Sequence, residues 1–258
     1  MTMANMLETI YTVWLRETIR FLKSKSRVIG SGGQPFIWLA IAGVGFAAAF
    51  GTVSGVNYLT FVAPGIIGMT LLFSSIFSGV NVIWDRQFGF LKEILIAPVS
   101  RVGIVLGKIA GSATVSLVTA IVILVVEILF NVLPLSKLTV LGMAEAVAFM
   151  ILIPCVFVSV GLIIASSVDN VEGFQVIINF LVMPLFFLSG ALFPLSNAPE
   201  WMKLVSSVDP LRYGIDGMRG ALIGVSSYPV YFDLLVVLAS AVVLVIVADI
   251  AFNRIEGK

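Results

Sequence analysis

The residue types that most often perform chemistry in proteins are scarce in this sequence. It has no histidine and a single cysteine, Cys155. Without histidine the commonest metal ligand and general base are missing, and a lone thiol cannot form an internal disulfide. The nearest approach to a phosphate-binding loop, Gly103, Gly107 and Lys108, has the wrong glycine spacing. We therefore expect no catalytic residue, no metal site and no nucleotide site on this chain.

Two acidic residues, Glu127 and Glu145, interrupt long apolar runs. A charge at the centre of a membrane helix costs roughly 2.5–3.5 kcal/mol on insertion scales, so such acids are candidates for function. Both lie near a short loop that contains Pro134 and Lys137, on opposite arms of a predicted helical hairpin. There they can pair with Lys137 or reach water. The position favours a structural or hydration role, with proton coupling as the alternative.

The overall composition indicates that lipid is the solvent for this chain. Hydrophobic residues make up 60% and charged residues 11%, with a mean hydropathy of +1.14. Soluble domains carry about a quarter charged residues. The net charge of +1 gives no reason to expect a nucleic-acid partner. We expect an all-α membrane protein in which residues 1–258 form a single transmembrane domain.

Six apolar runs are long enough for membrane-spanning helices, because a bilayer core takes about 20 mainly apolar residues per helix. Six spans place both termini on one side of the membrane. Eleven of the 15 basic residues fall on that side and four on the other, so the positive-inside rule predicts cytoplasmic termini in a multi-pass protein of the plasma membrane. The runs cover residues 35–51, 58–84, 103–130, 140–167, 174–193 and 230–252.

The N-terminal segment, residues 5–28, has the pattern of an amphipathic helix. Leu7 and Trp14 follow helical spacing with other apolar residues, and Arg16 and Arg20 begin a basic stripe on the opposite face. Such a helix can lie along the inner leaflet with its cations at anionic headgroups. A helix packed on a partner protein is the alternative, because it would use the same amphipathic pattern.

A second amphipathic helix is predicted over residues 85–98, in the loop between the second and third runs. Phe88, Leu91 and Leu95 recur at helical spacing, and Pro98 ends the helix. This helix either caps the bundle or inserts into a groove on a cytoplasmic partner.

Small residues follow this loop at intervals of four: Gly103, Gly107 and Gly111. Such a stripe lets a neighbouring helix approach closely. A smaller inner loop, residues 169–172, is either a second contact for a partner or a polar turn in which Asn170 ends a helix.

The segment between the fifth and sixth runs, residues 194–229, is too apolar for an ordinary loop and too charged to span. We expect two short helices, because the steps Asn197-Ala198-Pro199 and Asp209-Pro210 each offer a residue able to cap a helix and a proline for its first turn. Arg212 and Asp216 are spaced to pair on the second helix, as are Asp216 and Arg219. Irregular backbone at membrane depth must be buried or wet, which favours a re-entrant hairpin on the outer side.

Two stretches carry a resemblance to a known family. The first is the loop after the second run, and the second reads LSGALFPLSNAPEWM followed by DPLRYGIDGMR. Together they resemble type-2 ABC transporter permeases, the exporter class of daunorubicin-resistance permeases and of polysaccharide and nodulation-factor exporters. The positions matching the ATPase-coupling motif are Asp85, Arg86, Gly89, Leu91, Glu93, Leu95, Pro98, Ser100 and Arg101. The positions matching the outer-gate segment are Gly190, Pro194, Trp201, Asp209, Pro210, Arg212, Asp216 and Arg219.

The resemblance implies a transport subunit rather than an enzyme. Two ABC ATPase subunits would bind ATP and magnesium on separate chains, and a second copy of this permease or a homologue would complete the transporter. The expected function is export of an amphipathic small molecule, drug or lipid. Export of a polysaccharide or lipid-linked glycan is the alternative within the family, and an ATP-independent secondary transporter or channel is the alternative outside it.

Overall fold

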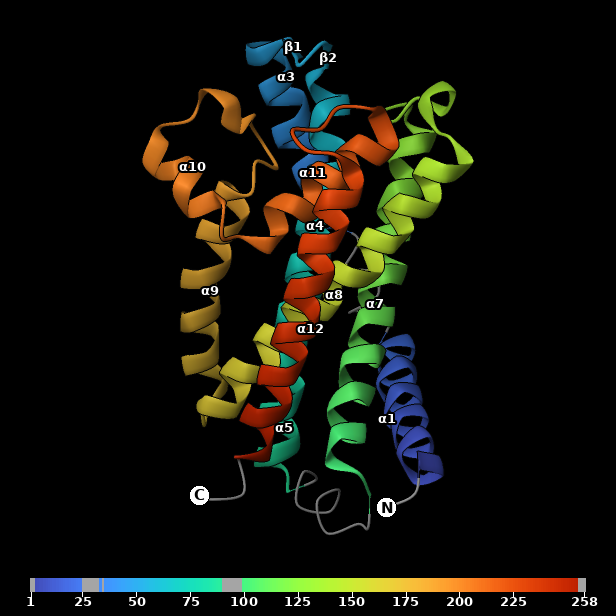
Figure 1. The fold of residues 1–258 in the computed structure, drawn as a ribbon, viewed down its shortest axis with the longest axis vertical. Helices are drawn as coiled ribbons and strands as arrows, with labels where there is room; N and C mark the ends of the chain where they lie inside the picture. Colours follow the sequence, from blue (N-terminus) through green and yellow to red (C-terminus); the bar gives the residue numbers. More distant parts are fainter. Residues whose placement is uncertain (1–2, 25–32, 34, 90–98, 255–258) are drawn as a thin grey trace.

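The computed structural model describes residues 3–24, 33, 35–89 and 99–254, and helices form most of this part of the chain (Figure 1). The α-helices are α1 (Met3–Lys23), α3 (Val44–Phe50), α4 (Tyr58–Ile76), α5 (Val80–Gln87), α7 (Arg101–Leu129), α8 (Val140–Ser167), α9 (Val171–Leu188), α10 (Glu200–Ser206), α11 (Pro210–Ile223) and α12 (Val230–Asn253). Shorter elements are the π-helix η1 (Leu39–Gly43), the 3₁₀ turns η2 (Phe77–Gly79), η3 (Leu135–Lys137) and η4 (Leu195–Asn197), and the antiparallel strands β1 (Thr52–Val53) and β2 (Val56–Asn57).

Among the described residues, five helices are long and apolar enough to cross a membrane. They are Tyr58–Gln87, Arg101–Leu129, Val140–Ser167, Val171–Leu188 and Val230–Asn253. Each overlaps a predicted span, with ends shifted by at most five residues. The first predicted span differs: the apolar helix Pro35–Phe50 is shorter, contains η1, and is followed by the β1–β2 hairpin that the sequence did not predict.

Side-chain caps mark the beginning of α7, α8 and α9. Ser100 accepts a hydrogen bond from the Gly103 N–H at 3.2 Å, and Thr139 accepts one from the Gly142 N–H at 3.0 Å. Each cap satisfies one of the N–H groups that a helix leaves unpaired at its start. Asn170 caps α9 in the same way, so the prediction that it ends a helix is wrong.

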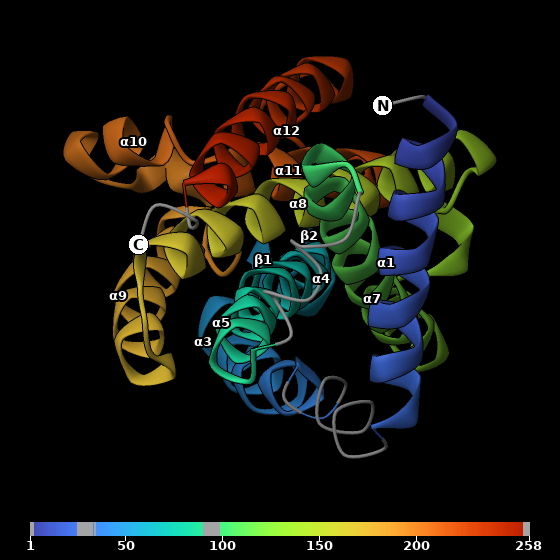
Figure 2. The same cartoon turned by 90° about the horizontal axis from the view of Figure 1, so that it is seen from below.

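The bundle is organised around α4. In its most apolar stretch 72% of the residues are buried, against 22% for α9 and 17% for α12. Seen from below, α4 and α5 lie near the centre, with α7 and α8 beside them, α1 on one flank and α9 on the other (Figure 2). The first turn of α1 and the last turn of α12 lie at the lower end in Figure 1, and the β-hairpin, α10 and α11 lie toward the upper end.

Two helices meet backbone to backbone where the long second span is interrupted. The turn η2 separates α4 from α5, and Gly79 in this turn faces Gly161 of α8. A Cβ built at Gly79 would lie 2.5 Å from the Gly161 carbonyl oxygen, and one built at Gly161 would lie 2.5 Å from the Ile76 carbonyl oxygen. Only glycine fits at both positions, so α8 crosses this turn at direct backbone contact.

Candidate functional site

A cluster of five charged side chains lies at the lower end of the bundle. We name Arg16, Glu17, Arg20, Asp85 and Lys108 the ion-pair cluster. The carboxylate of Asp85 accepts hydrogen bonds from Lys108 Nζ at 2.7 Å and from an Arg16 guanidinium nitrogen at 2.9 Å, and an Arg20 nitrogen lies 3.5 Å away. Lys108 also lies 3.7 Å from Glu17. The cluster therefore connects α1, α5 and α7 through charges.

The central members of the cluster are buried. Lys108 is 3% exposed, Asp85 4% and Glu17 6%, whereas the side chains of Arg16 and Arg20 are about a third exposed. Buried charges are tolerated only when paired and hydrogen-bonded, because removing an ion from water costs several kcal/mol. Asp85 and Lys108 meet both conditions, whereas Glu17 Oε1 and Arg20 Nη1 lie within ion-pair distance of an opposite charge without a hydrogen bond.

The glycine stripe brings α1 to this position. A Cβ built at Gly107 would lie 2.7 Å from the Cβ of Val13, and one at Gly111 would lie 2.7 Å from the Cβ of Glu17. The prediction of a closely packed neighbour along the stripe is confirmed, and the neighbour is α1. The cations of α1 were expected at anionic headgroups, whereas Arg16 and Arg20 turn toward Asp85 within the bundle.

The coupling motif begins inside a helix and not in a loop. Asp85 and Arg86 belong to the last turn of α5, which ends at Gln87, and Gly89 follows with φ of +76°. The predicted start of a separate helix at residue 85 is therefore wrong. Its remaining part, with Leu91, Glu93, Leu95 and Pro98, lies outside the described residues.

The end of α5 also contacts the inner loop between α8 and α9. Arg86 donates a hydrogen bond to the Val168 carbonyl and lies 3.5 Å from the Asp169 carboxylate. The neighbouring Gln87 donates to the Asp169 carbonyl at 3.4 Å. Farther along the chain, Ser100 caps α7 and Arg101 is its first residue. Charged and polar contacts thus join α5 to three other parts of the lower end: α1, α7 and the α8–α9 loop.

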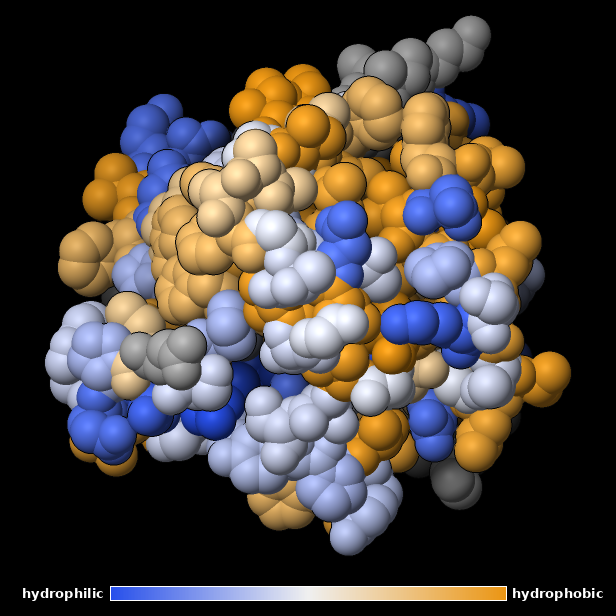
Figure 3. All heavy atoms as spheres, turned by 90° about the horizontal axis from the view of Figure 1, so that it is seen from above, coloured by the Kyte–Doolittle hydropathy of each residue, from blue (hydrophilic) through white to orange (hydrophobic). Residues whose placement is uncertain are grey.

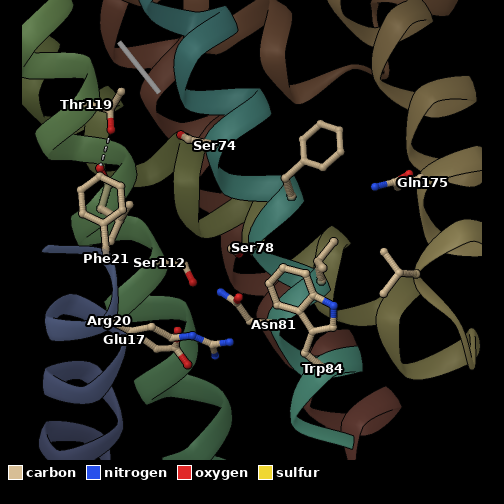
Figure 4. A pocket seen from close by; sticks show the side chains of 14 residues that line it. Glu17, Arg20, Phe21, Ser74, Ser78, Asn81, Trp84, Ser112, Thr119 and Gln175 are labelled. Atoms are coloured by element: carbon tan, nitrogen blue, oxygen red, sulfur yellow. Dashed lines mark hydrogen bonds between the residues drawn. The ribbon is translucent and has the colours of Figure 1, made fainter. Parts of the chain in front are cut away.

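A cavity of about 440 Å³ opens above the ion-pair cluster, between α1, the α4–α5 helix, α7 and α9 (Figure 4). Its lower part contains Arg20, Asn81 and Trp84, and Arg20 lies over the Trp84 ring at 6.0 Å from the ring centroid. The lining residues are Glu17, Arg20, Phe21, Ser74, Phe77, Ser78, Val80, Asn81, Trp84, Ser112, Val115, Thr119, Val171 and Gln175.

A second group of polar side chains lies at the upper end, around Arg219 of α11. Its guanidinium donates to the carbonyls of Phe61 at 3.1 Å, Gly190 at 3.0 Å and Ala191 at 3.4 Å, and it lies 3.9 Å from the Phe61 ring centroid. Burial lowers the pKa of Arg219 to about 10, so it stays charged at neutral pH. Arg219 therefore ties α11 to α4 and to the turn that ends α9.

The predicted pairs along α11 do not form. Asp216 instead accepts hydrogen bonds from the backbone N–H groups of Ser227 at 2.7 Å and Tyr228 at 3.1 Å. Arg212 donates to the Tyr228 hydroxyl at 3.3 Å. Asp216 and Arg212 therefore each bind the 224–229 loop instead of each other, because backbone donors in this loop lie within reach of the Asp216 carboxylate.

Helix ends in the predicted outer segment follow the sequence in part. Asp209 caps α11 by accepting from the Leu211 N–H at 2.9 Å, and Pro210 is in the first turn, as predicted. The prediction for the other helix is wrong in its start: α10 begins at Glu200, and Pro199 stands at the N-cap position instead of in the first turn.

The remaining outer-gate positions are spread out. Gly190 follows α9 with φ of +76°, and Pro194 lines a smaller cavity of about 120 Å³ together with Arg212, Asp216 and Arg219. Trp201 is 61% exposed on α10. Seen from above, hydrophilic side chains are interleaved with hydrophobic ones across this end (Figure 3).

The two intramembrane acids have different surroundings. Glu127 is fully buried, and its carboxylate has no hydrogen-bond partner in the described part of the chain. Glu145 is half-buried. Lys137 is exposed and forms no ion pair with either acid, so of the two alternatives, pairing with Lys137 or access to water, the pairing does not form.

Sequence reasoning missed most of the ion-pair cluster. It identified Asp85 as part of a coupling motif but assigned Arg16 to headgroups, and it considered Lys108 only as one of the eleven basic residues on the cytoplasmic side and as part of a mismatched phosphate loop. A lysine next to the glycine stripe in an apolar run was the available signal, because a charge there needs a partner from a neighbouring helix.

These features define a class of protein: a polytopic helical membrane protein with an internal cavity and buried charges, and with no group of three or more potential metal ligands among its described residues. The family model described as ABC-2 type transporter matches residues 8–223. The chain belongs to the ABC-2 type transporter family and is a multi-pass membrane transport permease.

Similar proteins carry permease names or a nodulation name. A protein named transport permease ycf38 from Porphyra purpurea is 32% identical over 192 residues, which cover 72% of this chain and 64% of that protein. Nodulation protein J of Rhizobium meliloti (strain 1021) is 27% identical, over 82% of this chain and 80% of its own length. Inner membrane transport permease YadH of Escherichia coli (strain K12) is 21% identical, over 91% of each chain.

Proposed function

We propose that this chain is the permease subunit of an ATP-driven exporter that moves an amphipathic small molecule, drug or lipid out of the cytoplasm. ATP and magnesium would bind to two separate ABC ATPase subunits, and a second copy of this permease or a homologue would complete the path. Membership of the ABC-2 type transporter family supports this proposal. The observation that carries it is the ion-pair cluster at the base of the bundle.

The cluster supports the proposal because of where the chain segment 90–98 is attached. This segment leaves α5 just after Asp85 and re-enters α7 seven residues before Lys108. The 2.7 Å contact between these two side chains closes the base of the loop, and Arg16 adds α1 to the same unit. A partner that pushes on residues 90–98 would therefore displace three helices together, whereas unlinked helix ends would absorb the displacement separately.

The exposed face of α9 supports the second permease copy. Val176, Phe180 and Met183 lie on this face and are 70%, 84% and 44% exposed. Such a continuous apolar stripe must be covered by lipid or by protein. In the proposed assembly two such faces enclose the substrate path, and residues 194–229 form a re-entrant gate at its outer end. The same proposal places both termini in the cytoplasm and the protein in the plasma membrane, in agreement with the basic-residue count.

Purification from the native membrane tests the proposed function. The tagged permease is solubilised with mild detergent, and vanadate-sensitive ATP hydrolysis in the eluate is measured. The expected result is a co-purifying subunit that hydrolyses ATP, with activity lowered at least fivefold by Asp85→Ala. Lys137→Gln, at an exposed site on the upper end, is the matched control and leaves the activity unchanged. A purified, folded permease without an associated ATPase contradicts the proposal.

A further inference from the structure

The cavity above the ion-pair cluster has an unusual distribution of hydrogen-bonding groups. Three lining hydroxyls already donate to backbone carbonyls of their own helical segments: Ser74 to Thr70 at 2.7 Å, Ser78 to Ser75 at 2.6 Å and Thr119 to Val115 at 3.0 Å. These hydroxyl protons are therefore already donated, whereas the hydroxyl oxygens can still accept a hydrogen bond from a ligand.

Three other lining side chains keep all of their hydrogen-bond donors and acceptors available to a ligand. Asn81, Ser112 and Gln175 form no hydrogen bond with any described residue, although each lines the cavity. The two amides provide donors and acceptors, and the serine provides both in one group. Polar groups of this kind fix the orientation of a ligand in an otherwise apolar site.

The charged lining residues already lie within ion-pair distance of opposite charges, and their atoms that lack a hydrogen bond, Glu17 Oε1 and Arg20 Nη1, are buried. Glu17 lies 3.7 Å from Lys108, and Arg20 lies 3.5 Å from Asp85 and over the Trp84 ring. A charged ligand would have to compete with these interactions. A neutral ligand would not, so the chemistry left for a ligand at this site is neutral hydrogen bonding.

Aromatic and apolar side chains form the rest of the wall. Phe21, Phe77 and Val115 line it alongside the hydroxyls, and Trp84 lies at its lower end beside Arg20 and Asn81 (Figure 4). Aromatic faces accept the apolar faces of sugar rings, and apolar walls accept alkyl chains. The volume of about 440 Å³ is within the range of small-molecule sites, roughly 300–1,000 Å³.

We propose that this cavity binds the neutral, hydroxyl-rich head group of an amphiphile, such as a glycoside, with the head hydrogen-bonded to Asn81, Ser112 and Gln175. The ligand hydroxyls donate to the oxygens of Ser74, Ser78 and Thr119, and the alkyl chain follows the aromatic wall. This assignment rests on the proposed function, because it names the head-group chemistry of the transported amphiphile.

The test measures binding of radiolabelled octyl glucoside to the full chain in lipid nanodiscs, at concentrations below micelle formation, with empty nanodiscs as the blank. Unlabelled octyl glucoside, octyl sulfate and octyltrimethylammonium compete in parallel. The three share one alkyl chain, so a difference between them reports the head group. We expect the glucoside to compete at least tenfold better than the two charged amphiphiles.

Variants locate the site. Asn81→Leu and Gln175→Leu each remove hydrogen bonds to the head group, and each should weaken octyl glucoside binding about fivefold. Ser112→Ala should weaken it less, and Ser240→Ala is the matched control, because Ser240 bonds to Val236 in its own helix and does not line the cavity. All four variants should elute as folded protein.

Equal competition by the three head groups overturns the proposal, as does binding that Asn81→Leu and Gln175→Leu leave unchanged. The assay needs no ATPase, so its outcome is separate from that of the proposed function. Selective glucoside binding without a co-purifying ATPase supports the cavity assignment and contradicts the exporter, and the reverse pattern contradicts the cavity assignment alone.

Discussion

Replacing Asp85 with alanine is the most informative single change at the lower end. Asp85→Ala removes the carboxylate that pairs with Lys108 at 2.7 Å and Arg16 at 2.9 Å. Lys108 is 3% exposed and would be left with Glu17 at 3.7 Å as its only carboxylate among the described residues. Breaking a buried pair from one side costs about 3–5 kcal/mol. Because Glu17 compensates in part, we expect a loss of about 3 kcal/mol in the free energy of unfolding.

The opposite truncation should cost less. Lys108→Met leaves Asp85 with Arg16 and Arg20, so the buried charge remains paired, and we expect a loss of about 2 kcal/mol from the missing charged hydrogen bond. In the double variant the uncompensated lysine is absent. Its loss should therefore be smaller than the sum of the single losses by about 1 kcal/mol or more.

Reversible unfolding in mixed micelles, with denaturing detergent as the titrant, measures these differences. The pair Glu200 and Lys203 on α10 is the control, because the Glu200 side chain is 91% exposed and such surface pairs contribute little. If Asp85→Ala costs no more than removal of this surface pair, or if the two single losses simply add, then the ion-pair cluster does not hold the lower end together.

Three further changes probe other contacts. Gly107→Leu should separate α1 from α7 and expose α1 to protease, because a Cβ at this position meets the backbone of α1 and the side chain of Val13. Gly45→Leu, at a position with open space around it, should not increase protease cleavage of α1. Burial raises the pKa of Asp209 to about 7, so between about pH 4 and pH 7 the folded state retains a proton that the unfolded state loses. The free energy of unfolding should therefore fall over this range and level off above it. Asp209→Asn, which keeps the cap, should remove this dependence. Arg219→Lys cannot reach three carbonyls at once, so a cysteine at the end of α9 should become more reactive to an impermeant thiol reagent than in the matched Arg212→Lys variant, and equal reactivity would contradict this role for Arg219.

The sequence predicted the positions of the helices better than it predicted which side chains contact one another. Apolar runs bounded by charge located the long helices, because membrane spans need about 20 apolar residues. The helix Pro35–Phe50 was harder to predict, because its 16 residues match the apolar pattern of a membrane span but are fewer than the about 20 that a span needs. Asp209 and Pro210 specified the start of α11 correctly, because capping is local chemistry.

Partners of charged residues could not be read from spacing along one helix. Arg212, Asp216 and Arg219 are spaced in sequence to pair with one another, yet Arg212 binds the Tyr228 hydroxyl, and Asp216 and Arg219 bind backbone groups of other segments. The same holds for Asp85 and Lys108, which lie 23 residues apart and meet only when α5 and α7 pack. Helix periodicity reports which residues share a face, whereas tertiary packing decides what that face meets.

The glycine crossing between η2 and α8 has a mechanical consequence. Gly79 and Gly161 each meet backbone atoms of the opposing segment, so no change of side-chain rotamer can relieve or tighten this contact. Sliding of one segment over the other would drive carbonyl oxygens into α-carbons, whereas a small rotation about the crossing would keep the distances. The crossing therefore permits rotation of α5 but not sliding. Such a rotation would displace Asp85 at the end of α5 while the buried helix α4 keeps its position.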